Sequence, residues 1–393
     1  MSRRINLLCT NIGRGHPFYL DGILEALTRR GQVGLVREHT DVLAVSCDVS
    51  RWAWQTVRWL YRNGSSPGLL SMVYNRLRAS ADYNRPSLFL KVMGRDVRRR
   101  FREDPDPLVV AHPTLVAIMR GKSDLIYQHG EVVVPREAAV AGASKVLVPT
   151  ADAAEASIRA GYRSNDVIVT GLCIEPSLVK QAADHFAGRL DRLAGRGCLV
   201  GAFFTSGAEP LQHVQKLTRA AVSAVAGGGK AIVFAEHNGR LTRSTMQAFE
   251  KRHFPVTSLS SEDLIPSELP EILLLQYCSR REEYGFAARL FRQFDYFVSP
   301  AHERTNWALG LGIPMFIVGP SIGPFAPLNR EVLLSAGVAQ PLDSVSATDG
   351  FGGLLEELRI TGALQSMARN GWGRLSVRGF DRIAEFLITT YGN

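Results

Sequence analysis

The amino-acid sequence predicts an α/β fold with two Rossmann-like domains that face a cleft. The chain has 393 residues, which is too long for a single compact core. Short apolar runs alternate with helical segments along the chain, a pattern typical of parallel sheets covered on both faces. We therefore expect a first domain over 1–172, a linker over 173–197, a second domain over 198–371 and a C-terminal helix over 372–393.

The first half of the chain contains six apolar runs of strand length. The first run leads into Leu20, Ile23, Leu24 and Leu27, whose spacing places them on one face of a helix. The strands are expected at 5–10, 35–40, 108–112, 125–129, 145–149 and 167–170, and the helices near 17–30, 51–62, 86–102, 113–121 and 151–161.

The second half repeats this alternation and ends in an amphipathic segment. Its strands are expected near 198–205, 230–236, 272–278, 295–299 and 315–318, and its helices near 210–226, 241–252, 281–293, 303–311, 326–336 and 349–358. At the C-terminus, Leu375, Phe380, Ile383 and Leu387 have helical spacing. This spacing predicts a helix that packs back on the domains.

Composition and targeting signals predict a cytoplasmic protein. The chain contains no apolar run of about 18 residues or more, the length that a membrane-spanning helix needs, and its N-terminus passes directly into the first strand without a signal peptide. The five cysteines are scattered and odd in number, which is typical of reduced thiols. No His, Cys or Asp cluster has metal-ligand spacing, so we expect no metal.

The net charge of +9 is unevenly distributed. Residues 1–170 hold 24 Lys and Arg against 16 Asp and Glu, whereas the remainder holds 22 against 21. A basic first half indicates either a surface that meets an anionic partner or a general bias toward solubility.

The segment from Asn11 to Gly22 places a glycine-rich turn between the first strand and the first helix. Gly13 and Gly15 permit close approach of a ligand, and His16 falls at the start of the helix, where backbone N–H groups can meet an anion or a polar sugar. The alternative is a tight strand-to-helix connection with a histidine that caps its own helix.

Four segments of the chain, in this order, resemble a GT-B glycosyltransferase. The resemblance is to the branch that contains the lipid II-forming N-acetylglucosaminyltransferase and the diacylglycerol glycosyltransferases. The segments are Gly13-Arg-Gly-His16; Asp124-Leu-Ile-Tyr-Gln-His129 with the run from Ala143 to Thr150; the run from Ala160 to Gly171; and the run from Asp295 to Val318 followed by Asn329, Ala336 and Gly337. The resemblance implies an enzyme that uses a nucleotide-sugar as substrate, with no cofactor.

The chain departs from this family in the donor segment. The family places a glutamate, associated with the ribose of the nucleotide, five residues before the glycine of a Gly-Ile-Pro motif, and Trp307 occupies that position here. We do not transfer the role to Trp307. The candidates by position only are His302, Glu303, Arg304, Thr305 and Asn306.

Inverting sugar transfer requires a base for the acceptor proton and support for the departing diphosphate. His16 is the expected base, because imidazole titrates near neutral pH. His129 and Glu131, which follow a strand, are further candidates for catalysis, and His112 is a candidate for the acceptor-side loop together with Gly13 and Gly15. Ordinary loop residues are the alternative for each.

In the second domain, several loops that follow strands provide candidate contacts to the donor. Small and hydroxyl residues at the start of a helix can bind a diphosphate or simply cap the helix, and an arginine neutralises phosphate or faces water. The candidates are Thr205, Ser206, Gly207, Arg240, Glu303, Arg304, Thr305, Asn306 and Asn329. The alternative for Asn329 is a helix cap.

The leading hypothesis is a metal-independent, inverting glycosyltransferase that moves a sugar from a nucleotide-sugar donor to an acceptor, with a lipid or lipid-linked group as the first choice. Two alternatives stay open. One is an enzyme acting on the sugar nucleotide itself, such as a 2-epimerase. The other is a GT-B-like binding module without catalysis, which the missing glutamate favours.

An aromatic and basic stretch suggests a peripheral contact with a membrane. Tryptophans and arginines alternate from Arg51 to Arg62, and a cationic segment runs from Arg95 to Arg102. This composition suits an anionic membrane surface on the inner face of the plasma membrane. The alternatives are that Trp52 and Trp59 belong to the core, or that the patch binds a soluble acidic acceptor. We expect no binding of nucleic acid.

Overall fold

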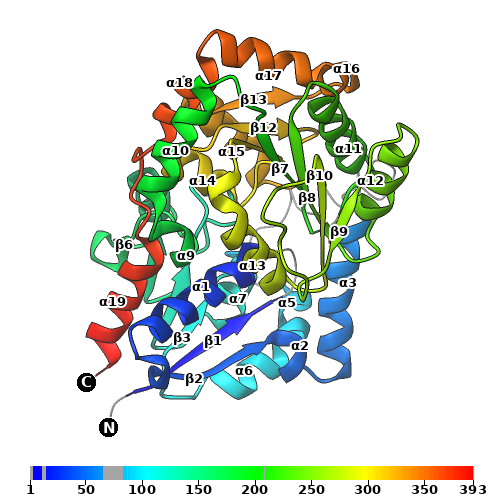
Figure 1. The fold of residues 1–393 in the computed structure, drawn as a ribbon. Helices are drawn as coiled ribbons and strands as arrows, with labels where there is room; N and C mark the ends of the chain where they lie inside the picture. The colour runs from blue at the N-terminus through cyan, green and yellow to red at the C-terminus, as the bar shows by residue number, and fades with distance from the viewer. Residues whose placement is uncertain (1–2, 11–14, 65–82, 86, 208, 393) are drawn as a thin grey trace. The chain divides into compact units, whose positions relative to one another are not determined.

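The computed structural model describes residues 3–10, 15–64, 83–85, 87–207 and 209–392 (Figure 1). The chain divides into two compact units. Unit 1 consists of Met1–Pro176 together with Leu375–Asn393, and unit 2 is Ser177–Arg374. Each unit is an α/β structure built on one parallel sheet, as the alternating pattern in the sequence predicts.

The described part of unit 1 holds a six-stranded sheet whose central strands are buried and rich in Val, Leu and Ile, whereas its edge strands are only half-buried. Such continuous apolar strands are typical of a parallel sheet covered on both faces. The strands are β1 (Ile5–Cys9), β2 (Val36–Asp41), β3 (Leu108–Val110), β4 (Leu125–Gln128), β5 (Lys145–Val148) and β6 (Val167–Val169). The helices are α1 (Gly15–Arg29), α2 (Val42–Val45), α3 (Asp48–Gly64), α5 (Leu88–Met93), α6 (Arg95–Phe101), α7 (Pro113–Met119), α8 (Ala151–Arg159) and α19 (Gly379–Tyr391).

The strand order in this sheet is β2-β1-β3-β4-β5-β6. The chain leaves β1 for β2 on one side and later crosses to β3 on the other side of β1. Connections from neighbouring strands therefore diverge at the carboxyl ends of β1 and β3. In open parallel sheets this divergence creates the place where ligands bind.

The C-terminal helix α19 belongs to unit 1, where it packs against α1 (Figure 1). The rings of Phe18 and Phe380 meet edge to face with centroids 5.5 Å apart. A Cβ built on Gly22 would lie 2.1 Å from the Phe380 ring, so only glycine allows this approach. The Leu172 N–H donates to the Ser376 carbonyl at 2.6 Å, which joins the returning chain to the end of the first domain.

Unit 2 contains a seven-stranded parallel sheet in the order β13-β12-β11-β7-β8-β10-β9. Its strands are β7 (Val200–Phe204), β8 (Lys230–Glu236), β9 (Thr257–Leu259), β10 (Ile272–Tyr277), β11 (Tyr296–Ser299), β12 (Met315–Val318) and β13 (Ala339–Leu342). Its helices include α10 (Ala182–Ala194), α11 (Leu211–Ala226), α12 (Arg240–Glu250), α13 (Arg280–Leu290), α14 (Thr305–Leu311), α15 (Phe325–Ser335), α16 (Val345–Asp349), α17 (Phe351–Ile360) and α18 (Ala363–Gly371). The connections diverge here between β7 and β11.

The boundaries of the units differ from the expected domains, because the segment expected as a linker contains a packed helix. Arg189 on α10 is fully buried and donates to the carbonyls of Phe294, Leu311 and Gly312. Burial lowers the pKa of the Arg189 guanidinium to about 9. These bonds fix α10 to unit 2, so the chain leaves unit 1 directly after Pro176 and returns to it after Arg374.

Several strands and helices of the structure were not predicted from the sequence. The two short strands β9 and β13 and the helices α10 and α18 were not expected. The helix expected near 86–102 is instead two helices, α5 and α6, which meet at Gly94. A Cβ at Gly94 would lie 2.4 Å from Ile118, so glycine is required there for close packing against α7.

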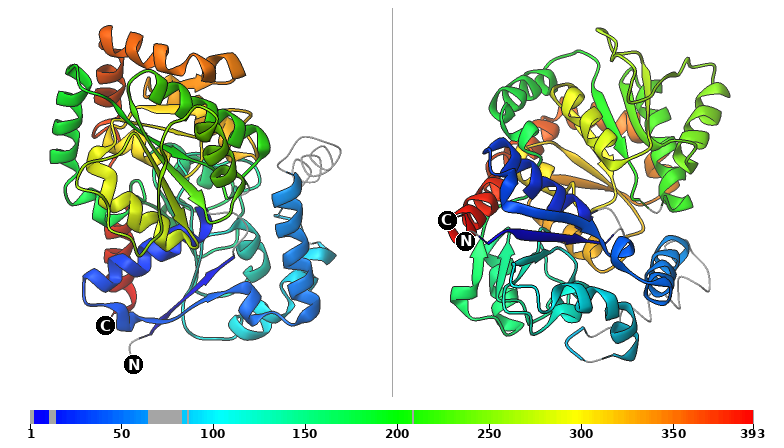
Figure 2. Two further views of the ribbon diagram at one scale, coloured as in Figure 1. Left: turned by 45° about the vertical axis from the view of Figure 1, so that its right-hand side comes forward. Right: turned by 90° about the horizontal axis from the view of Figure 1, so that it is seen from below.

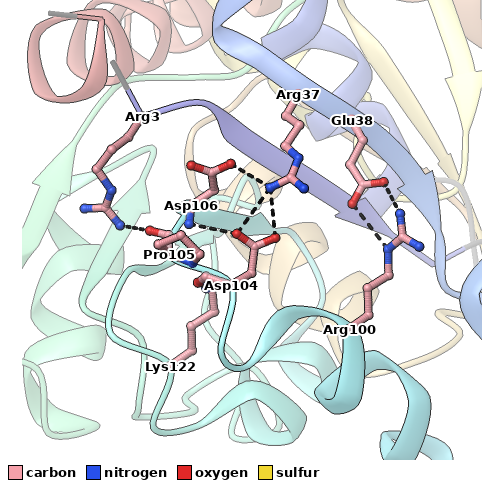
Figure 3. Close-up of polar contacts among 8 residues, drawn as sticks. All are labelled: Arg3, Arg37, Glu38, Arg100, Asp104, Pro105, Asp106 and Lys122. Atoms are coloured by element: carbon pink, nitrogen blue, oxygen red, sulfur yellow. Dashed lines mark hydrogen bonds and ion pairs between the residues drawn. The ribbon is translucent and has the colours of Figure 1, made fainter. Parts of the chain in front are cut away.

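Charged side chains gather at the amino ends of the strands of unit 1 (Figure 3). Arg37 pairs with Asp104 at 3.2 Å and with Asp106 at 2.9 Å, and Arg100 pairs with Glu38 at 2.6 Å. The two arginines are half exposed to water, so these pairs contribute little individually. Their position opposite to the ligand-binding end of the sheet indicates a structural role.

Candidate functional site

Three loops of unit 1 bring His16, His112 and Glu131 to the carboxyl ends of β1, β3 and β4, an arrangement that we call the histidine edge. His16 lies in the first turn of α1, and its Nδ1 lies 2.8 Å from the Ala111 carbonyl oxygen. Because a carbonyl oxygen can only accept, Nδ1 carries the proton of the neutral ring. The other nitrogen, Nε2, is therefore the one with a lone pair.

The neutral ring of His112 carries its proton on the other nitrogen from that of His16. It is the N-cap residue of α7, and its Nδ1 accepts the Thr114 N–H at 3.1 Å. The proton of the neutral ring consequently lies on Nε2. The His16 and His112 rings meet edge to face with centroids 4.3 Å apart. In their neutral forms the two adjacent rings thus carry their protons on different nitrogens, Nδ1 in His16 and Nε2 in His112.

Glu131 is held beside the start of α1. The Tyr19 hydroxyl donates to Glu131 Oε1 at 3.1 Å, and a Cβ built on Gly15 would lie 3.5 Å from the same oxygen. The N-terminus of a helix stabilises a carboxylate. The Tyr19 ring lies so close to Gly130 that a Cβ there would be 2.1 Å away. Sequence reasoning missed both Tyr19 and Gly130, because an aromatic residue on a helical face is normally assigned to the core.

Both ring nitrogens of His129 lie within hydrogen-bonding distance of groups outside the histidine edge. Its Nδ1 lies 3.2 Å from the Tyr127 hydroxyl and its Nε2 lies 2.9 Å from the Val133 carbonyl. Burial lowers the pKa of His129 to about 4. This geometry fits a role in holding the loop after β4 better than the catalytic role predicted for it. Gly13, predicted for the acceptor-side loop, lies outside the described residues.

In unit 2, most of the predicted donor residues lie at the carboxyl ends of β7 and β11, which we call the arginine edge. The exceptions are Arg240, which begins α12 after β8, and Asn329, which lies in α15 after β12. Thr205, Ser206 and Gly207 follow β7 directly. The Thr205 side chain is buried, and its Oγ1 has no hydrogen-bond partner among the described residues, as is also true of Thr305 Oγ1. Buried hydroxyls without a partner are costly, so both are places where a ligand or water would gain a hydrogen bond.

Arg304 is already engaged by two carboxylates. Its Nη2 donates to Glu283 Oε1 on α13 at 2.8 Å, and its Nη1 donates to Glu303 Oε1 at 3.3 Å. The guanidinium also lies over the Phe204 ring, 4.1 Å from its centroid. Two carboxylates around one buried cation leave no positive charge for a phosphate. This geometry does not favour a phosphate as the part of the donor that Arg304, predicted as a donor contact by position, would bind.

Trp307 explains why no glutamate stands at the family position. Its ring is buried among Phe204, Phe291 and Phe297, each in edge-to-face contact with centroids 5.4 to 5.9 Å away. A carboxylate there would be buried among these rings, and the nearest cation, Arg304, whose guanidinium lies 5.4 Å from the Trp307 ring centroid, is already paired with Glu283 and Glu303. Burying a third carboxylate beside them is unfavourable. Of the neighbouring candidates, Thr305 and Asn306 are buried, whereas His302 and Glu303 are half-buried.

Two further predicted donor residues have protein partners. Asn329 lies inside α15 and donates through Nδ2 to the Ala301 carbonyl at 3.2 Å, so it links α15 to the loop after β11 and does not cap the helix. The backbone N–H of Arg240 donates to Glu209 Oε2 at 2.6 Å, and its guanidinium donates to the Glu209 carbonyl. Glu209 thereby accepts a hydrogen bond from a backbone N–H in the first turn of α12, which has no partner within the helix.

Sequence reasoning also missed His213, which is in the first turn of α11. Its Nε2 donates to the Pro320 carbonyl at 2.7 Å, and its Nδ1 has no hydrogen-bond partner among the described residues. Burial lowers the pKa of His213 to about 4, and burial also lowers the pKa of His302. The signal available in the sequence was a histidine shortly after a loop that follows a strand, but its apolar helical neighbours masked it.

No family model matches the chain, and no curated protein matches its sequence. Solved structures do match. A Listeria monocytogenes protein assigned as a UDP-N-acetylglucosamine 2-epimerase is 14% identical, with a TM-score of 0.57, and the match covers 99% of this chain and 96% of that one. The glycotransferase of kitacinnamycin is 13% identical, with a TM-score of 0.50 and complete coverage of both chains.

UGT71G1 of Medicago truncatula, solved with UDP-glucose, is 11% identical, with a TM-score of 0.51 and 99% coverage of both chains. The chain has a GT-B-type fold. At these identities the matches establish the fold alone, and they agree with the two Rossmann-like domains predicted from the sequence. Within the described residues, no helix has the length and apolar character needed to cross a membrane, and no cluster of side chains is suited to hold a metal ion.

Proposed function

We propose that the chain is an enzyme that binds a UDP-sugar and transfers the sugar to an acceptor hydroxyl with inversion and without a metal ion. The observation that supports this most directly is the hydrogen bond from His16 Nδ1 to the Ala111 carbonyl. It leaves the lone pair on Nε2, at the divergence point of the sheet where ligands bind. UDP-sugars are the substrate or ligand named for two of the matched structures.

In this mechanism His16 Nε2 accepts the hydroxyl proton while the acceptor oxygen attacks the anomeric carbon of the sugar. General base catalysis of this kind contributes about 10²- to 10⁴-fold. Glu131, held by Tyr19, supplies a negative charge at the same edge that stabilises the imidazolium as it forms. The bond from the anomeric carbon to the UDP oxygen breaks, and the diphosphate leaves with its electron pair.

The arginine edge of unit 2 is the proposed donor site. Thr205 and Thr305 supply buried hydroxyls that lack partners among the described residues, and Ser206 follows Thr205 at the end of β7. Hydroxyl and backbone N–H groups support a diphosphate by hydrogen bonding. With Trp307 in place of the family glutamate, the ribose has to be bound by other groups, for which Asn306 and His302 are the candidates by position.

Epimerisation at C2 of a UDP-sugar is the second candidate function. It is favoured by the match to the Listeria protein over almost the whole length of both chains. In that case a base removes a proton from the sugar and no acceptor takes part. A ligand-binding module without turnover is the third possibility, and the paired Arg304 and buried Trp307 favour it.

One NMR experiment separates these functions. The purified chain is incubated with UDP-N-acetylglucosamine or UDP-glucose, with and without an acceptor mixture of alkyl glucosides and diacylglycerol, and phosphorus and proton spectra are followed. Transfer releases UDP only when acceptor is present. Epimerisation yields a new UDP-sugar without free UDP. Ligand broadening without a product supports a binding module, and no broadening with either nucleotide contradicts UDP-sugar binding altogether.

A lipid or lipid-linked acceptor is proposed from the surface that α3 and α5 form. Figure 2 shows the two helices next to each other, and they are in direct contact. Trp52 on α3 is 65% exposed and Leu88 on α5 is 78% exposed, and Trp59 and Phe89 are also exposed. Trp54, between the two exposed tryptophans, is buried and donates to the Met93 carbonyl. Trp52 and Trp59 therefore do not belong to the core.

Three cations, Lys91, Arg95 and Arg99, are exposed on α5 and on the following helix α6. Exposed tryptophans with neighbouring cations complement an anionic lipid surface. Flotation with phosphatidylglycerol vesicles tests this: wild type is expected to float at low salt, and a Trp52→Ser, Trp59→Ser variant is expected to remain below. Equal flotation of the two, or no flotation of wild type, would contradict lipid docking at this surface.

A further inference from the structure

The turn that joins β7 to α11 contains a residue in an unfavourable backbone conformation. Glu209 has a φ of 42°, in the left-handed region that few residues other than glycine, asparagine and aspartate adopt. It also precedes Pro210, and a residue before proline favours extended backbone. Such a conformation persists only where surrounding interactions impose it, and it is most common at functional sites. Here those interactions come from Arg240, at the start of α12.

Arg240 holds Glu209 at two points, an arrangement that we call the α12 clamp. The Arg240 N–H donates to Glu209 Oε2 at 2.6 Å, and the Arg240 guanidinium donates to the Glu209 carbonyl at 3.3 Å. Glu209 is buried. Gly239 allows the carboxylate to approach, since a Cβ built there would lie 2.8 Å from Glu209 Oε2. Because Arg240 is the first residue of α12, its N–H has no acceptor within the helix. The carboxylate therefore binds a group whose position the helix sets.

The loop that presents the α12 clamp is fixed by its own hydrogen bonds. The Glu236 carbonyl accepts the Gly239 N–H and the Thr242 hydroxyl, both at 2.7 Å. The Arg243 guanidinium donates to the Asn238 carbonyl. The clamp is consequently fixed relative to the end of β8, which is the neighbour of β7 in the sheet.

Glu209 also closes the turn that carries the proposed donor contacts. Its N–H donates to the Ser206 carbonyl at 3.0 Å. Ser206 follows Thr205, whose buried hydroxyl has no hydrogen-bond partner among the described residues. The turn lies at the carboxyl end of β7, beside the point where the connections of this sheet diverge. The conformation of Glu209 thus determines the path of the chain from β7 to α11.

We propose that Glu209 is a positioning residue, which holds the turn after β7 in the conformation that binds the diphosphate of the nucleotide-sugar. This inference rests on the proposed function, in which the donor binds at the arginine edge. Without the α12 clamp, the turn would relax toward the extended backbone that Pro210 favours in the residue before it. The hydroxyl and N–H groups of Thr205 and Ser206 would then no longer be presented together. Arg240 acts through Glu209 and not by contact with phosphate.

Binding of UDP to the full-length chain tests this role. Glu209→Gly removes the carboxylate without adding strain, because glycine adopts a positive φ freely. Glu209→Gln keeps an oxygen that can accept the Arg240 N–H. By titration calorimetry we expect Glu209→Gly to bind UDP about tenfold more weakly than wild type, and Glu209→Gln to stay within about threefold. Uridine, which lacks the diphosphate, should bind all three proteins equally in saturation-transfer NMR. Equal weakening of UDP and uridine would overturn the inference.

Two variants of Arg240 separate the positioning role from a direct phosphate contact. Arg240→Pro removes the backbone N–H. Proline is favoured at the first helical position, and Gly239 already has the extended backbone that precedes a proline. Arg240→Ala keeps the N–H and removes only the guanidinium. We expect Arg240→Pro to weaken UDP binding as much as Glu209→Gly does, and Arg240→Ala to weaken it less.

The combined Glu209→Gly, Arg240→Pro variant should bind UDP no more weakly than either single variant, because all three lack the same bond. Additive losses in the combined variant would overturn the inference. Equal losses in Arg240→Pro and Arg240→Ala would also overturn it, because they would assign the effect to the guanidinium.

Asn238→Gly is the matched control. Asn238 is exposed and has a φ of 55° in the loop before α12, so the variant introduces glycine beside the α12 clamp without removing either of its bonds. It should bind UDP as wild type does. A wild-type chain that does not bind UDP would contradict the proposed function itself. Binding of UDP by wild type that Glu209→Gly retains in full would contradict only the positioning role of Glu209.

Discussion

The histidine edge of unit 1 and the arginine edge of unit 2 occupy the same place in their sheets but differ in chemistry. Both lie where connections diverge from adjacent parallel strands. At the histidine edge, His16 Nδ1 donates to the Ala111 carbonyl and the Thr114 N–H donates to His112 Nδ1, so the two neutral rings carry their protons on different nitrogens. At the arginine edge, the guanidinium of Arg304 is paired with the carboxylates of Glu283 and Glu303.

The comparison shows that topology determines where a ligand can bind, whereas the partners of each side chain determine what can be done there. From the sequence alone, an arginine in a loop after a strand is a candidate for binding a phosphate. Its charge is available only if no carboxylate from another element reaches it, and Glu283 on α13 does reach it at 2.8 Å. The following predictions test this difference between the two edges.

The largest effect is expected from His16→Gln at the histidine edge. Glutamine keeps a polar side chain but cannot accept the acceptor proton, so turnover of the UDP-sugar should fall about 10²- to 10⁴-fold. The measurement is kcat for the product identified by NMR, with thermal unfolding as the control for stability. A decrease of less than about threefold would remove His16 from the mechanism.

At the arginine edge the largest effect is expected on stability. Glu283→Ala leaves the buried Arg304 with one, more distant carboxylate, Glu303. Breaking a buried pair in this way costs about 3–5 kcal/mol, which denaturant unfolding would show as a lower midpoint. The double variant Glu283→Leu, Arg304→Met should recover most of the loss. Equal stability of Glu283→Ala and wild type would mean that Arg304 is not a buried, paired cation.

Stability is expected to decrease in mildly acidic solution because each unit buries a neutral histidine. The pKa of His129 in unit 1 and that of His213 in unit 2 are both lowered to about 4 by burial. The unfolded chain, with histidine pKa values near 6.5, therefore binds protons first. The contribution is fully present above about pH 6.5 and is lost toward pH 4, by about 1.4 kcal/mol per pH unit for each histidine.

Unfolding free energies between pH 7 and pH 4.5 check this prediction for the two units separately. His129→Gln and His213→Gln should each reduce the dependence of stability on pH relative to wild type. Carboxylates also titrate in the lower part of this range, so the quantity compared is the difference between variant and wild type. A variant with the same pH dependence as wild type would show that the pKa of its histidine is the same in the folded and the unfolded chain.

The smallest effect is expected at the amino ends of the strands in unit 1. Asp106→Asn removes one carboxylate from the half-exposed Arg37 (Figure 3), which should cost at most about 1 kcal/mol and less at high salt. Turnover should not change. Loss of turnover in this variant would contradict the assignment of function to the carboxyl ends of the strands alone.

The two-domain α/β fold could be predicted because its determinants are local. Buried parallel strands are recognised in a sequence as short apolar runs. From β1 to β12, every strand except β9 was predicted with bounds that differ from those of the structure by only a few residues. β9 and β13 were missed because they are short strands at the sheet edges, where exposed residues such as Ser258 and Pro341 interrupt the apolar pattern. The helix α10 was missed because its buried face includes a charged residue, Arg189. The guanidinium of Arg189 donates hydrogen bonds to carbonyls from distant segments, those of Phe294, Leu311 and Gly312.

The candidate site was predicted in part for the same reason. His16, His112 and Glu131 follow apolar strands, and the order of strands in a parallel sheet brings such positions to one edge. Tyr19 and His213 were missed, because their helical spacing is equally typical of core residues. His129 and Arg304 were selected by the same rule as His16, and their partners across the fold give them structural roles.

By itself, the sequence determined where chemistry can be located in this protein, because strand ends, turns and helix starts are set by residues adjacent in the chain. Only the tertiary structure decided which of these groups are available and in which hydrogen-bonding state. That decision depends on atoms from distant segments, such as the Ala111 carbonyl that fixes the proton of His16 and the Glu283 carboxylate that neutralises Arg304. Hydrogen bonds and ion pairs act over a few ångströms, and sequence spacing does not contain those distances.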